Sequence, residues 1–410
     1  MKNRGIIINT MTISNRAKNI SPSLTLAITA KAAKMKADGK DIVTFTAGEP
    51  DFNTPDYIVA AAKLAMDKGL TRYTASSGIL PLKEAICQKL KKDNHLTYAP
   101  NQIVVSNGAK HSLYNAFMAI LNEGDEVLIP APYWLTYPEL VTLCGAIPKF
   151  ITPPASNNFK LTPDVLKASI TKKTKAIVFN NPSNPTGVVY TKGEIQALAQ
   201  VLEAANIYVI ADDIYEKLIY DNLEFYSIAQ FSDKLKQNTI VVNGLSKAFA
   251  MTGWRIGYTA STPELAKAMD NIQSHTTSNA NTIAQYASVA ALTDRLGDAF
   301  LSDSIKLFDS RRQLMITLLE ECKPLTYVRP NGAFYVMVDM AYFVGKTLMG
   351  KNIQSAADFA ELLIEHAHLV TIPCESFGAP TFIRLSYCID EAQIKKGLTR
   401  LKSFVAEVVS

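Results

Sequence analysis

The chain has 410 residues, a length that fits two domains of ordinary size. Hydrophobic residues make up 48% of the chain and charged residues 19%, which is typical of an ordinary soluble globular protein. The net charge of +5 is spread along the chain without a long basic run, so we expect no nucleic-acid partner, and the small excess favours anionic small molecules.

Neither a membrane nor an oxidising compartment is indicated by the sequence. No apolar run approaches the about 20 residues that a membrane-spanning helix needs. The cysteines are odd in number and form no Cys-x-x-Cys pair; they are Cys87, Cys144, Cys322, Cys374 and Cys388. We therefore expect free thiols, no membrane association and a cytoplasmic protein.

The N-terminal 37 residues contain no acidic residue, which gives them a faint likeness to an organelle transit peptide. Residues 21–36, however, have the pattern of a capped helix, and this favours an ordinary start of the fold. Met11 is an alternative start of the protein, in which case the residues before it are a leader without meaning.

From about residue 56, helical and strand patterns alternate, which predicts βαβ units around a mostly parallel sheet. Helices are expected at 109–121 and 192–205, and strands at 102–106, 126–130, 146–151, 175–179, 207–211 and 238–243. Polar residues follow four of these strands, at 107–108, 180–181, 212–213 and 246–247. Polar clusters at the same end of successive strands predict one cleft, the expected position of an active site.

After about Leu301 the pattern changes to a long charged helix, a helix near 355–366, and strands at 369–373 and 382–387. This indicates a smaller α+β domain that the N-terminal residues complete. We therefore expect three segments: an arm with part of the small domain (1–55), a large domain (56–300) and the small C-terminal domain (301–410).

Residues 244–257 carry the strongest chemical signal. Ser246 and Lys247 follow a strand of β-branched residues, and Arg255 comes eight positions after the lysine. Gly253 and Gly257 flank the arginine and would let backbone approach a ligand closely. A hydroxyl, an amine and a guanidinium in one small space suit a phosphate and a carbonyl, although a surface Lys and Arg near a loop is the plainer alternative.

Gly108, Ala109 and Lys110 open a helix directly after a strand, so their free backbone N–H groups are expected to form an anion site. An ordinary strand-to-helix turn is the alternative. The sequence has no G-x-x-x-x-G-K-[ST] and no G-x-G-x-x-G motif, and nicotinamide and flavin chemistry lose their main support.

Two charged residues are placed where burial is costly. Asp212 ends an apolar strand, where an isolated carboxylate needs a cation, and strand alternation turns its neighbour Asp213 the other way. Arg384 lies in the middle of a strand, and such a residue is rarely buried unless paired. The planar guanidinium is suited to binding a carboxylate with two hydrogen bonds.

The stretch 244–257 resembles the lysine-containing signature of class I pyridoxal-phosphate aminotransferases, and the resemblance extends over nearly the whole chain from about Ile13. It implies an α/β fold of fold type I, with a mostly parallel seven-stranded sheet. It also implies pyridoxal 5′-phosphate as the cofactor, held as a Schiff base on Lys247, and no metal. Asp212 would bind the ring nitrogen, and Tyr215 the phenolic oxygen.

Other motifs add further roles by resemblance. The implied cofactor-binding residues are Tyr73, Gly108, Ala109, Lys110, Trp134, Asn184, Asp212, Tyr215, Ser246, Lys247 and Arg255. The implied substrate-binding residues are Thr25, Gly48, Lys110, Trp134, Asn184 and Arg384, with Arg384 on the α-carboxylate. Tyr73 would reach the phosphate of the neighbouring subunit, which implies a homodimer with shared active sites.

Lys110 bears on the substrate. Residues 106–110 are similar to the Ser-x-Gly-Ala-Lys segment of one bacterial branch, subgroup Ib, in which the lysine meets the distal carboxylate of aspartate or glutamate. Residues 21–25, which include Thr25, also resemble this branch. The resemblance therefore implies ping-pong transamination of aspartate with 2-oxoglutarate, giving oxaloacetate and glutamate. The alternative interpretation is that Lys110 is a solvent-exposed lysine in the first turn of the helix, without a role in binding.

Several alternatives stay open within the same fold. The enzyme could be an aspartate/prephenate aminotransferase, an aromatic, alanine or kynurenine aminotransferase, or a decarboxylase. A different class is a regulator that binds the cofactor without catalysis. It would need a DNA-binding segment, and the region before Gly48 is too short for one plus a linker.

Overall fold

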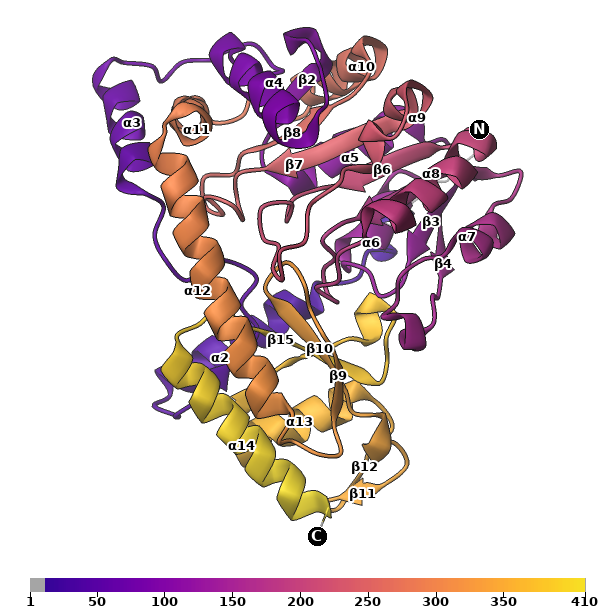
Figure 1. Ribbon diagram of the computed structural model, residues 1–410, viewed down its shortest axis with the longest axis vertical. Coiled ribbons are helices and arrows are strands. Elements are labelled where there is room, and N and C mark those ends of the chain that lie inside the picture. Colours follow the sequence, from indigo (N-terminus) through magenta and orange to yellow (C-terminus); the bar gives the residue numbers. More distant parts are fainter. Residues whose placement is uncertain (1–11, 410) are drawn as a thin grey trace, which may run out of the picture.

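The computed structural model describes residues 12–409, which form two packed parts around two sheets (Figure 1). The upper part in Figure 1 is built on a seven-stranded sheet, and the lower part on a four-stranded sheet. The long helix α12 (Leu296–Leu319) extends from the first part to the second. The predicted divisions at residues 55 and 300 remain a proposal, and residue 300 lies within α12.

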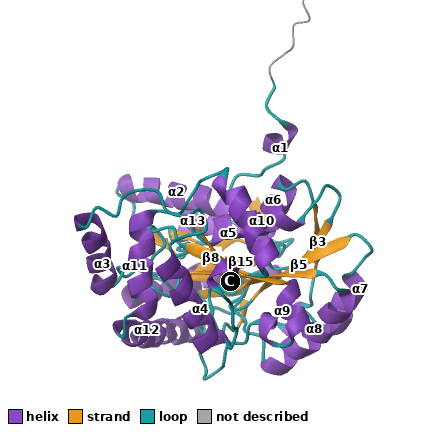
Figure 2. Ribbon diagram, turned by 90° about the horizontal axis from the view of Figure 1, so that it is seen from above, coloured by secondary structure: helices purple, strands orange, loops and turns teal. Residues whose placement is uncertain are grey.

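The seven-stranded sheet has the order β2-β8-β7-β6-β5-β3-β4, and it is mostly parallel, as the resemblance implied. Strand β8 is antiparallel to both of its neighbours, β2 and β7. Its strands are β2 (Ile103–Ser106), β3 (Glu126–Pro130), β4 (Ile147–Ile151), β5 (Thr174–Asn180), β6 (Tyr208–Asp212), β7 (Thr239–Gly244) and β8 (Gly257–Ala260). Both faces are covered by helices (Figure 2), which is why the inner strands are nearly continuous apolar runs; the edge strand β4 is partly exposed.

The helices of this part divide between the two faces of the sheet. Helices α5 (Ala109–Ile120), α6 (Thr136–Leu143) and α10 (Pro263–Ser274) share one core cluster with inward residues such as Ile240 and Val242. The opposite face packs against α3 (Asp56–Asp67), α4 (Leu80–Asn94), α7 (Pro163–Ser169), α8 (Lys192–Ala205), α9 (Asp233–Asn238) and α11 (Thr282–Thr293). Alternate residues of each strand thus serve opposite layers.

The second part is an antiparallel sheet in the order β14-β15-β10-β9. Its elements are β9 (Thr326–Val328), β10 (Tyr335–Asp339), β14 (Ile372–Pro373) and β15 (Phe382–Ser386), with the hairpin β11 (Thr347–Leu348) and β12 (Lys351–Asn352) and helices α13 (Ala356–Ala367) and α14 (Glu391–Val409). The N-terminal strand β1 (Val43–Thr44) pairs with β13 (Leu369–Val370), and Phe45 is fully buried in the core of this part. The expected contribution of N-terminal residues to this core is therefore present.

Most expected strands are found within one or two residues of their predicted ends. The single strand expected at 369–373 is instead two short strands in different sheets, β13 beside β1 and β14 beside β15. The N-terminal helix differs as well. Helix α2 (Leu24–Ala37) begins three residues after the predicted start, and the Ser21 N–H donates to the Glu139 carboxylate (3.1 Å). The antiparallel strand β8 was not predicted. A short helix α1 (Asn15–Lys18) precedes α2, and Met11 with the residues before it lies outside the described part. All five cysteines are free thiols.

Candidate active site

A cavity of about 440 Å³ opens at the carboxyl ends of the parallel strands, between the two sheets. It is lined by most of the predicted site residues: Thr25, Gly48, Ala109, Lys110, Trp134, Asn184, Asp212, Tyr215, Ser246, Lys247, Arg255 and Arg384. Gly108 and Tyr73 are not among its lining residues. The polar ends of β5, β6 and β7 therefore meet in one cleft, as predicted, whereas the segment after β2 lines it only with Ala109 and Lys110 at the start of α5.

Lys247 follows β7 and extends into this cavity. Its Nζ donates to the carbonyl oxygen of Gly48 (2.5 Å) and lies 5.9 Å from the ring centre of Tyr215. Burial lowers the pKa of Lys247 to about 8, although Cys388 and Glu49 act in the opposite direction; the guanidinium groups of Arg384 and Arg255 add a smaller lowering effect. An amine with this pKa is partly neutral near pH 8, so it can act as a nucleophile.

Asp212 ends β6 and is 3% exposed. Its carboxylate accepts from the Tyr137 hydroxyl (2.6 Å) and the Ile214 N–H (3.3 Å). Burial raises its pKa to about 6 even though both hydrogen bonds and Lys247 act in the opposite direction. No ion pair to Asp212 is present within residues 12–409, and the buried carboxylate is therefore suited to a cationic ring nitrogen. Asp213 faces the other way and accepts from Ser227.

A cradle for an anion lies where α5 begins. Gly108 has φ of 84° and packs on the Arg255 guanidinium, and a Cβ there would lie only 2.4 Å from Arg255 Nη2. Arg255 donates only to backbone carbonyls, of Thr252 (2.9 Å) and Asn107 (3.4 Å), and has no carboxylate partner within the described residues. The free N–H groups of α5 and this unpaired guanidinium suit a phosphate. Gly108 thus shapes the site without lining it.

The two glycines that flank Arg255 differ in their surroundings. A Cβ at Gly257 would lie 2.2 Å from the backbone nitrogen of Ala109, so the close approach is between β8 and the start of α5. A Cβ at Gly253 would have nothing within 4 Å. Only one of the two glycines is required by packing, and it holds the helix end that faces the cavity.

Arg384 enters the cavity from β15 and is 3% exposed. Its Nη1 donates to the Asn184 side-chain oxygen (3.0 Å), whereas its buried Nε has no partner. No carboxylate of residues 12–409 forms an ion pair with it, and its charge is met by the Asn184 oxygen and by the ring faces of Tyr335 and Phe377. A buried guanidinium without an acidic partner is suited to the carboxylate of a small ligand.

The side of the cavity that contains α5 and α2 carries a different set of groups. Lys110 Nζ lies 5.0 Å from the ring centre of Trp134, and burial together with the Arg255 charge lowers the pKa of Lys110. The Thr25 hydroxyl is buried and has no hydrogen-bond partner within the described chain. A second cation and an unused hydroxyl therefore border the same cavity as Arg384.

Tyr73 stands apart from these groups. Its side chain is 89% exposed and does not reach the cavity of its own chain. The N–H of the next residue, Thr74, donates to the side-chain oxygen of Asn279 (3.3 Å). A role for Tyr73 in an active site therefore requires a second subunit.

The sequence profile of the family described as "Aminotransferase class I and II" matches residues 40–401, which is most of the chain. The chain belongs to the aminotransferase class I and II family. It is 46% identical to the "Aspartate aminotransferase" of Bacillus sp. (strain YM-2), with 96% of this chain and 99% of that protein covered. It is 44% identical to the "Aspartate/prephenate aminotransferase" of Cereibacter sphaeroides, with 96% and 98% covered.

Solved structures agree with this assignment and confirm the predicted fold. The aspartate aminotransferase from Rhizobium meliloti superposes with a TM-score of 0.93 at 41% identity, with 97% of this aminotransferase and 99% of that chain covered. The enzyme from Thermus thermophilus with maleate gives a TM-score of 0.91 at 37% identity, with 96% and 100% covered. The predicted aminotransferase activity, amino-acid and 2-oxo-acid substrates and pyridoxal-phosphate dependence are those of this family.

Two tyrosines of the aminotransferase site were missed by the sequence analysis. Tyr137, on α6, donates to Asp212, and Tyr335, on β10, lies 3.0 Å from the Tyr215 hydroxyl. Tyr137 follows Trp134 by only three residues, and this closeness to a predicted site residue was a usable signal. Tyr335 gave no such signal, because it is one of several apolar residues in a buried strand.

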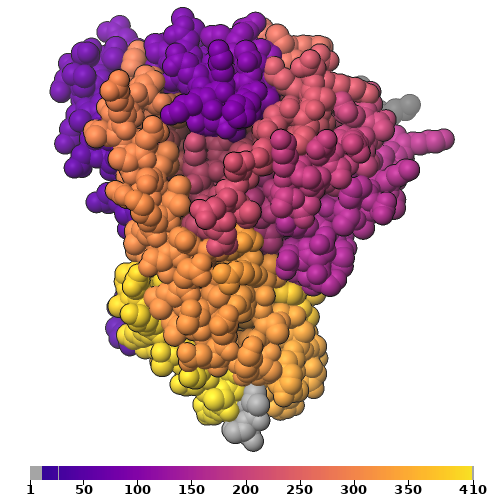
Figure 3. All heavy atoms as spheres, in the orientation of Figure 1, coloured from indigo at the N-terminus to yellow at the C-terminus, as the bar shows by residue number. Residues whose placement is uncertain are grey.

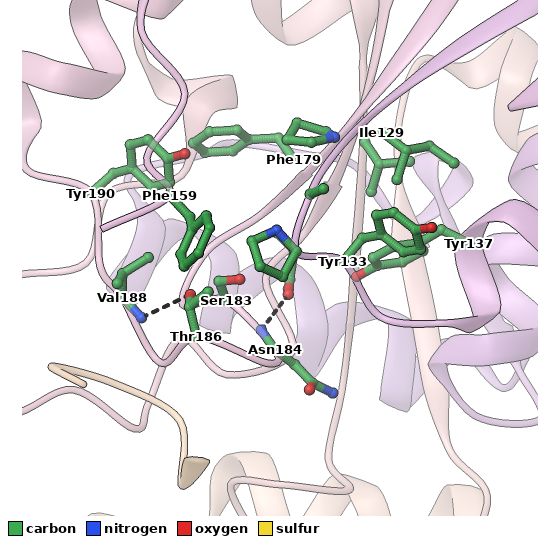
Figure 4. Close-up of a pocket in the computed structure, with 15 residues that line it drawn as sticks. Ile129, Tyr133, Tyr137, Phe159, Phe179, Ser183, Asn184, Thr186, Val188 and Tyr190 are labelled. Atoms are coloured by element: carbon green, nitrogen blue, oxygen red, sulfur yellow. Dashed lines mark hydrogen bonds between the residues drawn. The ribbon is translucent and has the colours of Figure 1, made fainter. Parts of the chain in front are cut away.

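A small pocket of about 30 Å³ lies behind the loop that carries Asn184, lined by aromatic and aliphatic side chains (Figure 4). In Figure 4 the Asn184 amide points away from this pocket, while its backbone N–H is held by the Asn180 side chain (2.8 Å). Asn180 in turn donates to the Asp212 carbonyl (2.9 Å). The loop is thus tied to the strand that presents Asp212, so both side chains are fixed relative to each other.

A second hollow, of about 280 Å³, opens between α4, α12 and the loops after β6 and β7 (Figure 3). Its charged side chains include the pairs Lys89 with Glu216 and Lys217 with Asp93 (2.9 Å).

Within residues 12–409, no helix has the length and apolar character to cross a bilayer, and no cluster of three metal-ligating side chains occurs. The cavity around Lys247 is therefore the better site for catalysis.

Proposed function

We propose that this aminotransferase moves the amino group of L-aspartate to 2-oxoglutarate, yielding oxaloacetate and L-glutamate. The observation that carries the proposal is the pair of cations, Arg384 and Lys110, that border one cavity with Lys247 and have no acidic partner among the described residues. Two cations in one cavity suit a substrate with two carboxylates. Relatives named as aspartate aminotransferases support the same substrate.

The residues present fit pyridoxal phosphate. The N-terminal N–H groups of α5, Ser246 and Arg255 would hold its phosphate, and Gly108 leaves room for Arg255. Asp212 would hold the ring nitrogen, Tyr215 and Asn184 the phenolic oxygen, and Trp134 would stack on the ring. When bound, the cofactor supplies an electron sink for the bonds at the substrate Cα.

The chain's own groups bind, orient and move protons. Arg384 would fix the α-carboxylate, and Lys110 the distal carboxylate with the Thr25 hydroxyl beside it. Lys247 would hold the cofactor, and its Nζ would take the proton from the substrate Cα. Its pKa of about 8 suits both roles near neutral pH, and the Gly48 carbonyl fixes its position.

We further propose a cytoplasmic homodimer with shared active sites. Tyr73 is 89% exposed and would complete the phosphate site of the second subunit. Exposed apolar side chains occur nearby in sequence, at Leu64 (51%), Met66 (48%) and Leu80 (56%), which fits a covered surface. The free thiols fit a reducing compartment.

A second candidate is transamination with prephenate as the amino acceptor. The buried, unpartnered Thr25 hydroxyl beside Lys110 leaves a polar group for a larger acceptor, and the Cereibacter sphaeroides relative is named for both activities. An aromatic aminotransferase is less well supported, since Lys110 would face an apolar side chain.

A panel of amino donors with 2-oxoglutarate, and of acceptors including prephenate with aspartate, tests the proposal. We expect kcat/KM for aspartate to exceed that for alanine and phenylalanine by at least tenfold. Higher kcat/KM for phenylalanine than for aspartate would refute aspartate as the donor, and no transamination with any pair would point to the regulator.

A further inference from the structure

Tyr335 is a buried side chain of the cleft without an assigned role. It is 1% exposed, lies on β10 and lines the cavity of Lys247. In the register of β10 and β15, Tyr335 pairs with Ser386 and Met337 pairs with Arg384. Tyr335 and Arg384 are therefore diagonal neighbours on one face of the four-stranded sheet.

The ring of Tyr335 supports the guanidinium of Arg384. The centre of the guanidinium lies 4.3 Å from the ring centroid, within the range of a cation–π interaction. Arg384 has no carboxylate partner in the described chain, so this aromatic face is a main source of compensation for its charge. The ring therefore holds the arginine in place before a carboxylate arrives.

The hydroxyl of Tyr335 reaches the other part of the molecule. It lies 3.0 Å from the hydroxyl of Tyr215, which belongs to the turn after β6 of the seven-stranded sheet. Burial raises the pKa of Tyr335 to about 12 and that of Tyr215 well above 10, so both hydroxyls keep their protons at neutral pH. If Tyr215 donates to the cofactor, its oxygen is free to accept from Tyr335.

We propose that Tyr335 is a positioning residue that links the carboxylate site at Arg384 to the cofactor site at Tyr215. Its ring holds Arg384 and its hydroxyl donates to Tyr215, which makes Tyr215 a stronger donor to the phenolic oxygen. The proposal rests on the proposed function, in particular on Tyr215 facing the cofactor. Neither effect requires Tyr335 to touch substrate.

Two variants of the cofactor-loaded enzyme distinguish the role of the Tyr335 ring from that of its hydroxyl. Tyr335→Phe keeps the ring and removes the hydroxyl, whereas Tyr335→Leu removes both. The first readout is the pH midpoint of the absorbance change of the bound cofactor. We expect this midpoint to rise in both variants, by less than in Tyr215→Phe, because a weaker donor stabilises the anionic oxygen less.

The second readout is the Kd of succinate, a dicarboxylate without an amino group, measured by calorimetry. We expect Tyr335→Leu to raise the Kd of succinate roughly three- to tenfold, the size of a partly desolvated cation–π contact. Tyr335→Phe should leave this Kd within about twofold of wild type. Tyr387→Phe is the matched control, since Tyr387 is equally buried and its hydroxyl donates to the Ala333 carbonyl (3.2 Å) outside the cavity.

An unchanged midpoint in Tyr335→Phe, or an unchanged succinate Kd in Tyr335→Leu, overturns the proposal. So does an equal shift in Tyr387→Phe, which would show a general effect on the fold. Failure of the proposed function looks different: the wild-type protein itself would then show no cofactor absorbance that changes with pH, or no succinate binding.

Discussion

At the scale of single residues, the site depends on groups that are buried at a cost in free energy. Asp212 and Asp213 are adjacent and both nearly inaccessible, and burial raises the pKa of each. Asp213 is held by Ser227 on the structural side, whereas Asp212 faces the cavity with only Tyr137 and a backbone N–H as donors. The unmet charge of Asp212 is what makes it useful toward a cationic ligand.

We predict that Asp212→Asn stabilises the cofactor-free protein while it lowers kcat. The pKa of Asp212 is raised from 3.8 to about 6, so its ionisation costs stability as pH rises from about 4 to 6. Above pH 6 the free energy of unfolding of the variant should exceed that of wild type by about 1–3 kcal/mol, and below pH 4 the two should be equal. Urea unfolding at pH 4 and pH 7.5 measures this. A variant less stable at pH 7.5 would contradict it.

The proposed role of Lys110 in recognition predicts a selective effect. Lys110→Ala should lower kcat/KM for aspartate by roughly 10²-fold, the size of a lost charge-assisted contact of about 2–3 kcal/mol, and change that for alanine by less than about threefold. Initial rates with the two donors measure the ratio. An equal loss for both donors would remove Lys110 from side-chain recognition.

At the scale of elements, the anion cradle is built by contact between the start of strand β8 and the start of helix α5. Gly257 at the start of β8 lies against Ala109, and Gly108 lies against the Arg255 guanidinium. These two contacts bring the free N–H groups of α5 and the arginine to the same point. The cradle is therefore sensitive to any side chain added between them.

We predict that Gly108→Ala weakens cofactor binding. Its Cβ would lie 2.4 Å from Arg255 Nη2, and its φ of 84° is unfavourable for alanine, so the guanidinium must move. The Kd of pyridoxal phosphate should rise by roughly tenfold or more, measured by fluorescence titration of the cofactor-free protein. Gly253→Ala is the control, because a Cβ there meets nothing within 4 Å. Similar Kd values for both variants would contradict the account.

Much of this fold could be predicted from the sequence because its strands are buried and end in polar pairs. The apolar runs placed β5, β6 and β7, and the residues after them correctly indicated one cleft. Strand alternation also separated Asp212 from Asp213. By contrast, β8 has the sequence GYTA, which lacks the run of apolar β-branched residues that marks the other strands.

Tyr335 and Tyr137 could not be assigned in advance for a related reason. A buried tyrosine looks the same in a sequence whether its hydroxyl meets a carboxylate, another tyrosine or a backbone carbonyl. Only the packing of β10 against the turn after β6 brings Tyr335 to Tyr215, and those segments are far apart in the chain. The division of the chain at residues 55 and 300 and the roles of the individual site residues remain predictions.

At the scale of the whole molecule, the cleft between the two sheets contains nearly every proposed group except Tyr73. If Tyr73 serves the second subunit, defects in two different subunits should complement each other. A subunit with Lys247→Ala and one with Tyr73→Ala form a mixed dimer in which one site has both native residues. Co-expression should restore about a quarter of wild-type activity, since half of the dimers are mixed and each has one intact site.

The measurement is the activity of the co-purified mixture compared with the sum of the two separate variants. Activity no higher than that sum would contradict shared active sites. Size-exclusion chromatography with light scattering on the same samples gives the oligomeric state directly, so a monomer would be recognised as the cause.

The central claim is that Lys247 carries the cofactor in this cleft. Its most direct test is to reduce the cofactor-loaded wild-type protein with borohydride, digest it and locate the modified lysine by mass spectrometry. The account predicts the pyridoxyl group on Lys247 alone, and no modification in Lys247→Ala. A pyridoxyl group on another lysine, such as Lys110, or on none, would contradict it.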